Sequence, residues 1–76
     1  MHELVEYLAK GLVDKPDEVR VERVERDGAV VLELHVAADD VGKVIGRQGR
    51  TARALRTIVR ASGARSNERA LLEIVG

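Results

Sequence analysis

Two glycines three residues apart lie in the most positively charged part of the chain. Gly46-Arg47-Gln48-Gly49 is flanked by Lys43 and Arg50, and no Asp or Glu occurs between Val41 and Asn67. Glycine has no Cβ atom, so a loop with glycine at both ends lets a ligand backbone lie close to the main chain. The surrounding cations attract phosphate groups. We interpret this segment as a site where a sugar–phosphate chain lies against backbone amides.

The side chains expected to contact a nucleic acid come from this loop and its two flanks. Arg47 and Gln48 project from the tip of the loop toward phosphate oxygens or base edges. Val44 and Ile45 provide an apolar floor for bases, because Tyr7 is the only aromatic residue that could stack on them. The predicted contact residues are Lys43, Val44, Ile45, Gly46, Arg47, Gln48, Gly49, Arg50 and Arg53.

The net charge of zero hides a strong separation of charge along the chain. The first forty residues carry five basic and eleven acidic side chains, which sum to −6, and the last thirty-six carry eight basic and two acidic side chains, which sum to +6. Arg53, Arg56 and Arg60 fall on one face of a predicted helix. Arg53 and Arg56 either extend a phosphate track or pair with acids of a partner subunit, and Arg60 is interpreted as a solvated side chain.

The chain shows no set of residues that would support catalysis or hold a cofactor. It has no cysteine, which removes thiolate metal sites and cysteine nucleophiles. His2 and His35 are far apart and have no second ligand in the sequence, so each is interpreted as a surface or sheet-face side chain. The nucleotide-binding patterns Gly-x-x-x-x-Gly-Lys-Ser/Thr and Gly-x-Gly-x-x-Gly are absent. We therefore expect a protein that is not an enzyme and that has no metal and no cofactor.

Length and hydropathy place the chain among small cytoplasmic proteins. Seventy-six residues allow one domain, residues 1–76, with a thin core. No apolar run approaches the roughly 18–20 residues that span a bilayer, and no signal peptide is visible. We expect a cytoplasmic protein without a membrane partner.

Hydrophobic spacing predicts three helices and three strands. Pro16 should end the first helix, Asp27-Gly28 should form a two-residue hairpin turn, and Gly63 should stop the last helix. Between Val21 and Val24 the alternation breaks, which indicates a bulge or an edge strand. The predicted elements are a helix at 2–13, strands at 19–26 and 30–36, helices at 40–45 and 50–62, and a strand at 69–75.

These elements, in the order α-β-β-α-α-β, predict an α+β fold. Three helices would cover one face of a three-stranded sheet. The two-residue hairpin makes the first strand pair antiparallel, and the crossover through two helices allows the last strand to run parallel to the second. Asp39 and Asp40 are interpreted as caps of the short helix at 40–45.

The loop and the element order resemble those of a known family. Val-Ile-Gly-Arg-Gln-Gly between two helices resembles the Ile-Gly-x-x-Gly signature of KH domains, and α-β-β-α-α-β is the order of the type II KH fold. The opening Glu-Leu-Val-Glu-Tyr-Leu-Ala-Lys and the segment Val-Asp-Lys-Pro-Asp-Glu-Val are similar to those of small stand-alone bacterial KH proteins, the KhpA (YlqC) family. The resemblance covers nearly the whole chain.

The resemblance implies a function. It implies that the chain holds short single-stranded RNA in a groove between the glycine loop, the helix that follows it and the last strand, with 64–68 as the variable loop. It also implies a post-transcriptional regulator or RNA chaperone that forms a homodimer, or a heterodimer with a larger KH protein of the Jag (KhpB) type. The alternative is a protein-interaction and dimerisation module whose basic face docks on an acidic partner.

Overall fold

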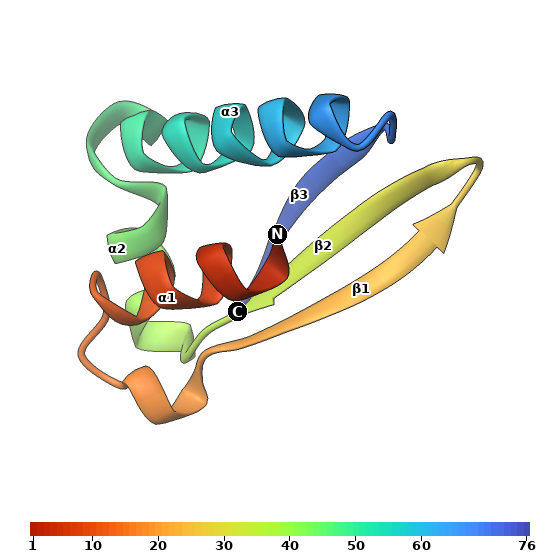
Figure 1. Ribbon diagram of the computed structural model, residues 1–76. Helices are drawn as coiled ribbons and strands as arrows, with labels where there is room; N and C mark the ends of the chain where they lie inside the picture. The colour runs from red at the N-terminus through yellow and green to blue at the C-terminus, as the bar shows by residue number, and fades with distance from the viewer.

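A three-stranded sheet carries the fold in the computed structural model, which describes residues 1–76 (Figure 1). β1 (Arg20–Arg26) pairs antiparallel with β2 (Ala29–His35), and β3 (Ala70–Val75) pairs parallel to β2. The strand order is therefore β1-β2-β3. At the hairpin turn, Asp27 and Gly28 both have positive φ, at 51° and 77°, as a two-residue turn between twisted strands requires.

Three helices cover one face of the sheet (Figure 1). They are α1 (His2–Lys10), α2 (Val41–Ile45) and α3 (Arg50–Arg65), and short 3₁₀ turns occur at Pro16–Glu18, Ala38–Asp40 and Arg47–Gly49. The predicted α+β class, element order and mixed sheet are confirmed. No helix combines the length and the apolar character needed to cross a lipid bilayer.

The core lies between this helical layer and the covered face of the sheet. Alternate residues of β2 point into it, and Leu32 and Leu34 are almost completely buried. Val5 of α1 and Val59 of α3 pack against them in the same cluster. Removing these aliphatic side chains from water is the main contribution that holds α3 on the sheet. The opposite face of the sheet is not covered by a helix.

One predicted helix end in the first half of the chain is wrong, and one of the two interpretations of the first strand is confirmed. The first helix ends at Lys10 rather than at residue 13, because Gly11 is a poor helix former and the chain leaves the helix in a turn there. β1 is an edge strand of the sheet, which confirms the second of the two interpretations. It contains no bulge, since its register against β2 is continuous from Arg20 to Arg26. Val21 and Val24 are three residues apart and so point to opposite faces of an edge strand, which explains the broken alternation.

The predicted end of the last helix is also wrong. α3 continues through Gly63 to Arg65. Gly63 is buried, and a Cβ atom there would lie 2.6 Å from Cβ of Ala70 and 2.9 Å from the carbonyl oxygen of Glu68. The residue is thus glycine because the helix and the start of β3 approach each other closely, and it does not terminate the helix.

Candidate nucleic-acid interface

The loop between α2 and α3 is built largely from left-handed backbone. Gly46, Gln48 and Gly49 have φ values of 77°, 57° and 74°. The N–H of Gly46 donates to the carbonyl oxygen of Gly42 at 2.9 Å, and the N–H of Gly49 donates to that of Gly46 at 3.1 Å. These bonds close a tight reversal between the two helices (Figure 1).

The two glycines of the loop have different surroundings. A Cβ atom at Gly46 would lie 2.8 Å from Cβ of Thr51 and 3.0 Å from its backbone nitrogen, so Gly46 is packed against the protein itself. A Cβ atom at Gly49 would meet only Nη2 of Arg53, at 4.0 Å. Gly49 is therefore the position where an approaching ligand finds main chain with open space in front of it.

α3 begins immediately after Gly49, and no side chain caps its first turn. The N–H groups at a helix N-terminus carry partial positive charge and bind anions such as phosphate. The uncapped N-terminus of α3 therefore lies beside the open glycine.

Two arginines of α3 hold the tip of the loop. Nη2 of Arg53 donates to the backbone oxygen of Gln48 at 2.9 Å, and Nη2 of Arg50 donates to the side-chain oxygen of Gln48 at 3.3 Å. Gln48 is one of only three non-glycine residues with positive φ. The contact from Arg53 supports this strained conformation, which is a role that the sequence did not indicate.

Two predicted contact residues, Val44 and Lys43, have different surroundings from those that the sequence suggested. Val44 is completely buried in the core, so its side chain is no floor for bases, whereas Ile45 is 39% exposed. Nζ of Lys43 lies 2.9 Å from Oδ2 of Asp14 and 3.7 Å from Oδ1 of Asp40. The hydrogen bond and the charge of Asp14 raise the pKa of Lys43, so this cation serves the protein's own carboxylates.

Asp40 is not the helix cap that its position predicts. No side-chain bond caps α2. Instead, the buried carboxylate of Asp40 accepts hydrogen bonds from the backbone N–H groups of Asp14 at 3.2 Å and Lys15 at 3.0 Å. Burial alone would raise the pKa of Asp40, but these two bonds and the nearby lysine charges outweigh it and lower the pKa. Asp40 thus ties the segment after α1 to the base of α2.

The lowered pKa predicts how stability depends on pH. A carboxyl whose pKa is lower in the folded state stabilises the fold above its unfolded pKa of about 3.9, and this contribution is lost as pH falls through the folded value. Asp40→Asn should lower the melting temperature by several degrees at pH 7, and the difference from wild type should shrink below about pH 4. Thermal melts followed by circular dichroism measure both effects.

Asp39→Asn is the matched control, because the Asp39 side chain is 85% exposed and contacts only Lys15, at 3.5 Å. Its melting temperature should stay close to that of wild type at both pH values. An Asp40→Asn deficit of equal size at pH 7 and pH 3 would contradict the proposed role of the carboxylate.

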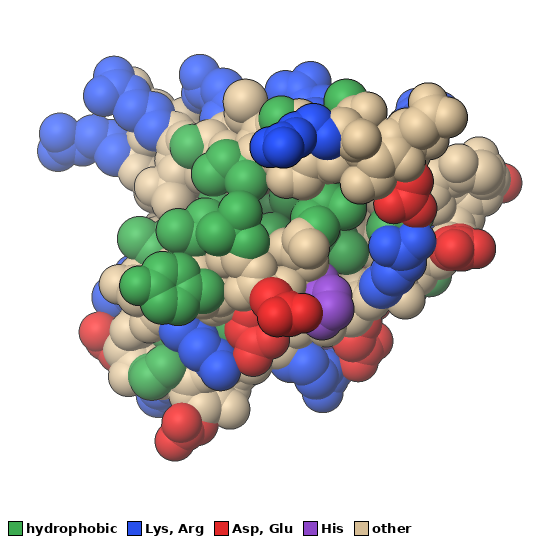
Figure 2. Space-filling view, in the orientation of Figure 1, with side chains coloured by type: hydrophobic (Ala, Val, Ile, Leu, Met, Phe, Trp, Pro, Cys, Tyr) green, Lys and Arg blue, Asp and Glu red, His purple; other side chains and the backbone are tan.

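The basic side chains before the glycine loop form ion pairs, and those from the loop onward do not. Every Lys and Arg up to Lys43 has a carboxylate oxygen within 4.0 Å, whereas no arginine from Arg47 to Arg69 has one. Figure 2 shows Lys and Arg side chains projecting along the edge of the molecule formed by α3. Positive charge on this surface is therefore not neutralised within the molecule.

A groove of about 590 Å³ runs between these arginines and β3. Arg53, Arg56 and Arg60 of α3 form one wall, and Leu71 and Leu72 of β3 contribute to the other. Arg69 also lines the groove, together with the hairpin end of the sheet. The sequence pattern favoured a solvated Arg60. The family resemblance implied that the last strand borders the groove, but it singled out neither Arg69 nor Leu71, because their position depends on how α3 lies against β3.

A Gly-x-x-Gly loop between two helices, within the element order α-β-β-α-α-β, defines a KH domain of type II. The chain matches the family described as KhpA/KhpB, KH domain, over residues 2–74, and it belongs to that family. The family predicted from the sequence is thereby confirmed.

Curated relatives match almost the entire chain. The RNA-binding protein KhpA of Clostridium acetobutylicum is 49% identical over 75 residues, which is 99% of this chain and 100% of the relative. The protein of the same name from Treponema pallidum is 52% identical over 73 residues, 96% of this chain and 91% of the relative. That of Aquifex aeolicus is 51% identical over 75 residues, 99% and 95% of the two chains. No solved structure gives a significant match.

Proposed function

We propose that this chain binds single-stranded RNA, with the phosphate backbone on the Gly46–Gly49 loop and the bases along the groove between α3 and β3. The observation that carries the proposal is the series of arginines without carboxylate partners that begins at the loop, of which Arg53, Arg56, Arg60 and Arg69 line the groove. The curated relatives are named as RNA-binding proteins, and this supports RNA as the ligand. With an RNA partner, we expect the chain to act in the cytoplasm, as a post-transcriptional regulator or RNA chaperone.

The role that we propose for each residue of the site follows from its position. Gly49 admits the sugar–phosphate chain, and the N-terminus of α3 faces its phosphates together with Arg47 and Arg50. Ile45 and Leu71 are exposed aliphatic side chains that support bases in place of aromatic residues. Arg53 holds Gln48 and thereby keeps the loop in its binding conformation. Val44 and Lys43 serve the fold rather than the ligand.

The salt dependence of binding tests the phosphate clamp. A KH loop clamps about four nucleotides, so we expect three to four phosphates to be neutralised. Affinity for a short single-stranded RNA should then fall with salt at a log–log slope near −2 to −3, at roughly −0.7 per phosphate. Fluorescence anisotropy at several salt concentrations measures the slope. A flat dependence would contradict the clamp, and a protein that binds no single-stranded RNA would contradict the function.

We also propose that the chain acts as a dimer, either with itself or with a larger KhpB-type protein. Leu4 and Tyr7 of α1 are 45% and 76% exposed. Figure 2 shows hydrophobic side chains gathered over α1 and toward α3. A contiguous apolar patch of this kind marks protein interfaces, and the family includes both KhpA and KhpB. Dimerisation would raise the affinity of two small RNA sites through avidity.

Sedimentation velocity of the purified chain, alone and mixed with a KhpB-type protein, tests the dimer. The alternative function is a protein-interaction and dimerisation module whose basic face docks on an acidic partner protein instead of RNA. The absorbance ratio of the freshly purified protein separates the two functions, because an RNA-binding domain copurifies with nucleic acid. A monomer at all micromolar concentrations, with or without the second protein, rules the dimer out.

A further inference from the structure

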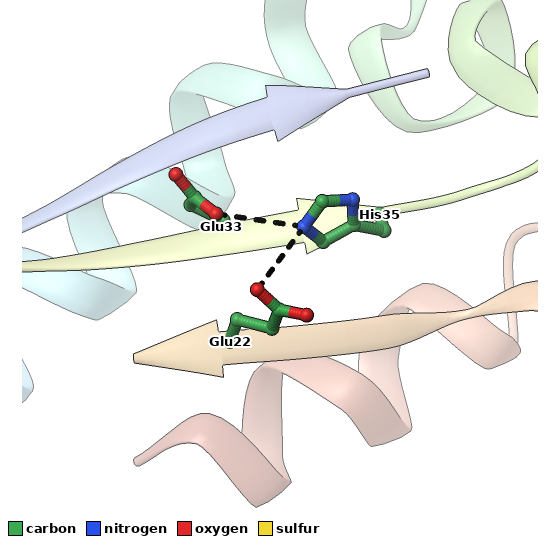
Figure 3. Close-up of side chains that lie close together, drawn as sticks. All are labelled: Glu22, Glu33 and His35. Carbon is green, nitrogen blue, oxygen red and sulfur yellow. Dashed lines mark ion pairs between the residues drawn. The ribbon is translucent and has the colours of Figure 1, made fainter. Parts of the chain in front are cut away.

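Three side chains with metal-binding atoms meet on the face of the sheet that no helix covers. Glu22 comes from β1, and Glu33 and His35 come from β2 (Figure 3). Glu22 and Glu33 are direct partners in the strand register, and His35 lies two residues beyond Glu33, so all three share one face. We infer that Glu22, Glu33 and His35 form a binding site for one divalent transition-metal ion, with Zn²⁺ as the best fit.

The spacing of the three side chains suits a metal ion better than direct hydrogen bonds. Nε2 of His35 lies 3.6 Å from Oε1 of Glu33 and 3.9 Å from Oε2 of Glu22. All three ligand atoms lie within 4.8 Å of one another. These distances exceed hydrogen-bond length, whereas ligands in a tetrahedral zinc site lie about 3.4 Å apart, given bonds of roughly 2.0–2.2 Å. Small side-chain rotations close the difference.

The imidazole nitrogen that faces the carboxylates has no partner of its own. Nε2 of His35 is inaccessible to solvent and makes no hydrogen bond. A buried nitrogen without a hydrogen-bond partner carries an energetic cost. A metal ion between the three atoms would give this nitrogen a partner.

The surrounding charges leave the carboxylates oriented toward the same point. Arg20 holds Oε1 of Glu22 at 2.9 Å, and Arg26 lies 3.5 Å from Oε2 of Glu33. Each arginine therefore engages the oxygen that is not directed at His35, as outer groups do when they orient metal ligands. Arg26 is also shared with Glu73, at 3.5 Å. Three carboxylates therefore share two guanidinium groups. Two like charges directly opposite each other on neighbouring strands, as in Glu22 and Glu33, are unfavourable unless a cation lies between them.

The donor set indicates which class of metal binds. An imidazole nitrogen with two carboxylates favours zinc and other first-row transition metals over Mg²⁺ and Ca²⁺, which prefer oxygen ligands alone. Three protein ligands leave a fourth tetrahedral position for water. The sequence predicted no metal because the ligands come from two strands, and only the register of the hairpin brings Glu22 opposite Glu33.

Zinc titration by isothermal calorimetry, on untagged protein carrying His2→Ala, tests the site. The background substitution is needed because the amino group of Met1 and the imidazole of His2 offer a second place for zinc. We expect one ion per chain with micromolar affinity, and a higher melting temperature when zinc is bound. Glu22→Gln and His35→Gln should each weaken binding by about tenfold or more. Glu25→Gln, on the opposite face of β1, should leave the affinity unchanged.

Spectroscopy on the same His2→Ala protein gives a readout that does not depend on the folding of further variants. Co²⁺ should produce the visible absorption of a tetrahedral site, and the ring ¹⁵N resonance of His35 should shift when zinc is added. The inference is overturned if zinc does not bind at millimolar concentration. It is also overturned if both substitutions leave the affinity unchanged, or if the His35 ring titrates identically with and without zinc, since a proton would then be the only occupant.

Discussion

Replacing both Arg47 and Gln48 by aspartate abolishes binding of single-stranded RNA, we expect, and leaves the fold intact. Both side chains are exposed at the tip of the loop and make no contact with the core. Aspartate tolerates the left-handed backbone that Gln48 adopts, so the substitution does not unfold the loop. Two new carboxylates beside the N-terminus of α3 repel phosphate where the clamp should attract it. Juxtaposed like charges cost several kcal/mol, so affinity should fall by roughly a hundredfold or more.

A control with the same change in net charge separates a local effect from a general one. Ala64→Asp with Arg65→Asp also removes one arginine and adds two carboxylates, at two exposed positions at the other end of α3. Fluorescence anisotropy with one RNA compares the two variants, and circular dichroism and thermal melts check the fold. Equal losses in both variants, or RNA binding that survives Arg47→Asp with Gln48→Asp, would show that the loop is not the binding site.

The second large effect concerns the groove. Arg56→Glu should weaken RNA binding by at least about tenfold, since it reverses an unpaired positive charge that lines the groove. Arg65→Glu makes the same change on the same helix, at an arginine that is also unpaired but does not line the groove. We expect its effect on affinity to be much smaller.

The comparison of Arg56→Glu and Arg65→Glu distinguishes a track for RNA from a general attraction between a basic helix and a polyanion. If both variants lose the same affinity at every salt concentration, the nucleic acid does not follow the groove. If only Arg56→Glu loses affinity and its salt slope becomes shallower by about one contact, at roughly 0.7, the phosphate backbone passes this position.

Much of the fold could be predicted because its signals are local. The Asp27-Gly28 pair determines its own turn, and the alternation of Val30, Leu32 and Leu34 identifies a strand whatever it pairs with. The glycines at 46 and 49 lie between two helical patterns, so the residue pattern alone identifies the loop and the basic helix after it. The ends of the first and last helices could not be predicted in the same way, because one glycine ends a helix and the other does not: α1 ends before Gly11, whereas Gly63 lies within α3 where the helix packs closely against the start of β3.

The parts of the site that could not be predicted depend on contacts between distant residues. Asp40 looks like a helix cap in the sequence, but its partners are Asp14 and Lys15, more than twenty positions away. Lys43 likewise looks like a free cation in the sequence, because its partner Asp14 lies far away along the chain. Val44 and Ile45 are adjacent and equally apolar, and only the packing of α2 decides that Val44 is buried and Ile45 is exposed.

The concentration of unpaired arginines on one long edge of the molecule has a kinetic consequence. The negative charge of an RNA strand rotates such a protein before contact, so that α3 faces the RNA. Collisions therefore lead to binding more often than randomly oriented collisions would. The groove is small and holds no aromatic ring, so a captured strand also leaves quickly. Rapid capture with a short residence time lets a single copy sample many transcripts, and a longer stay depends on a second binding domain held nearby.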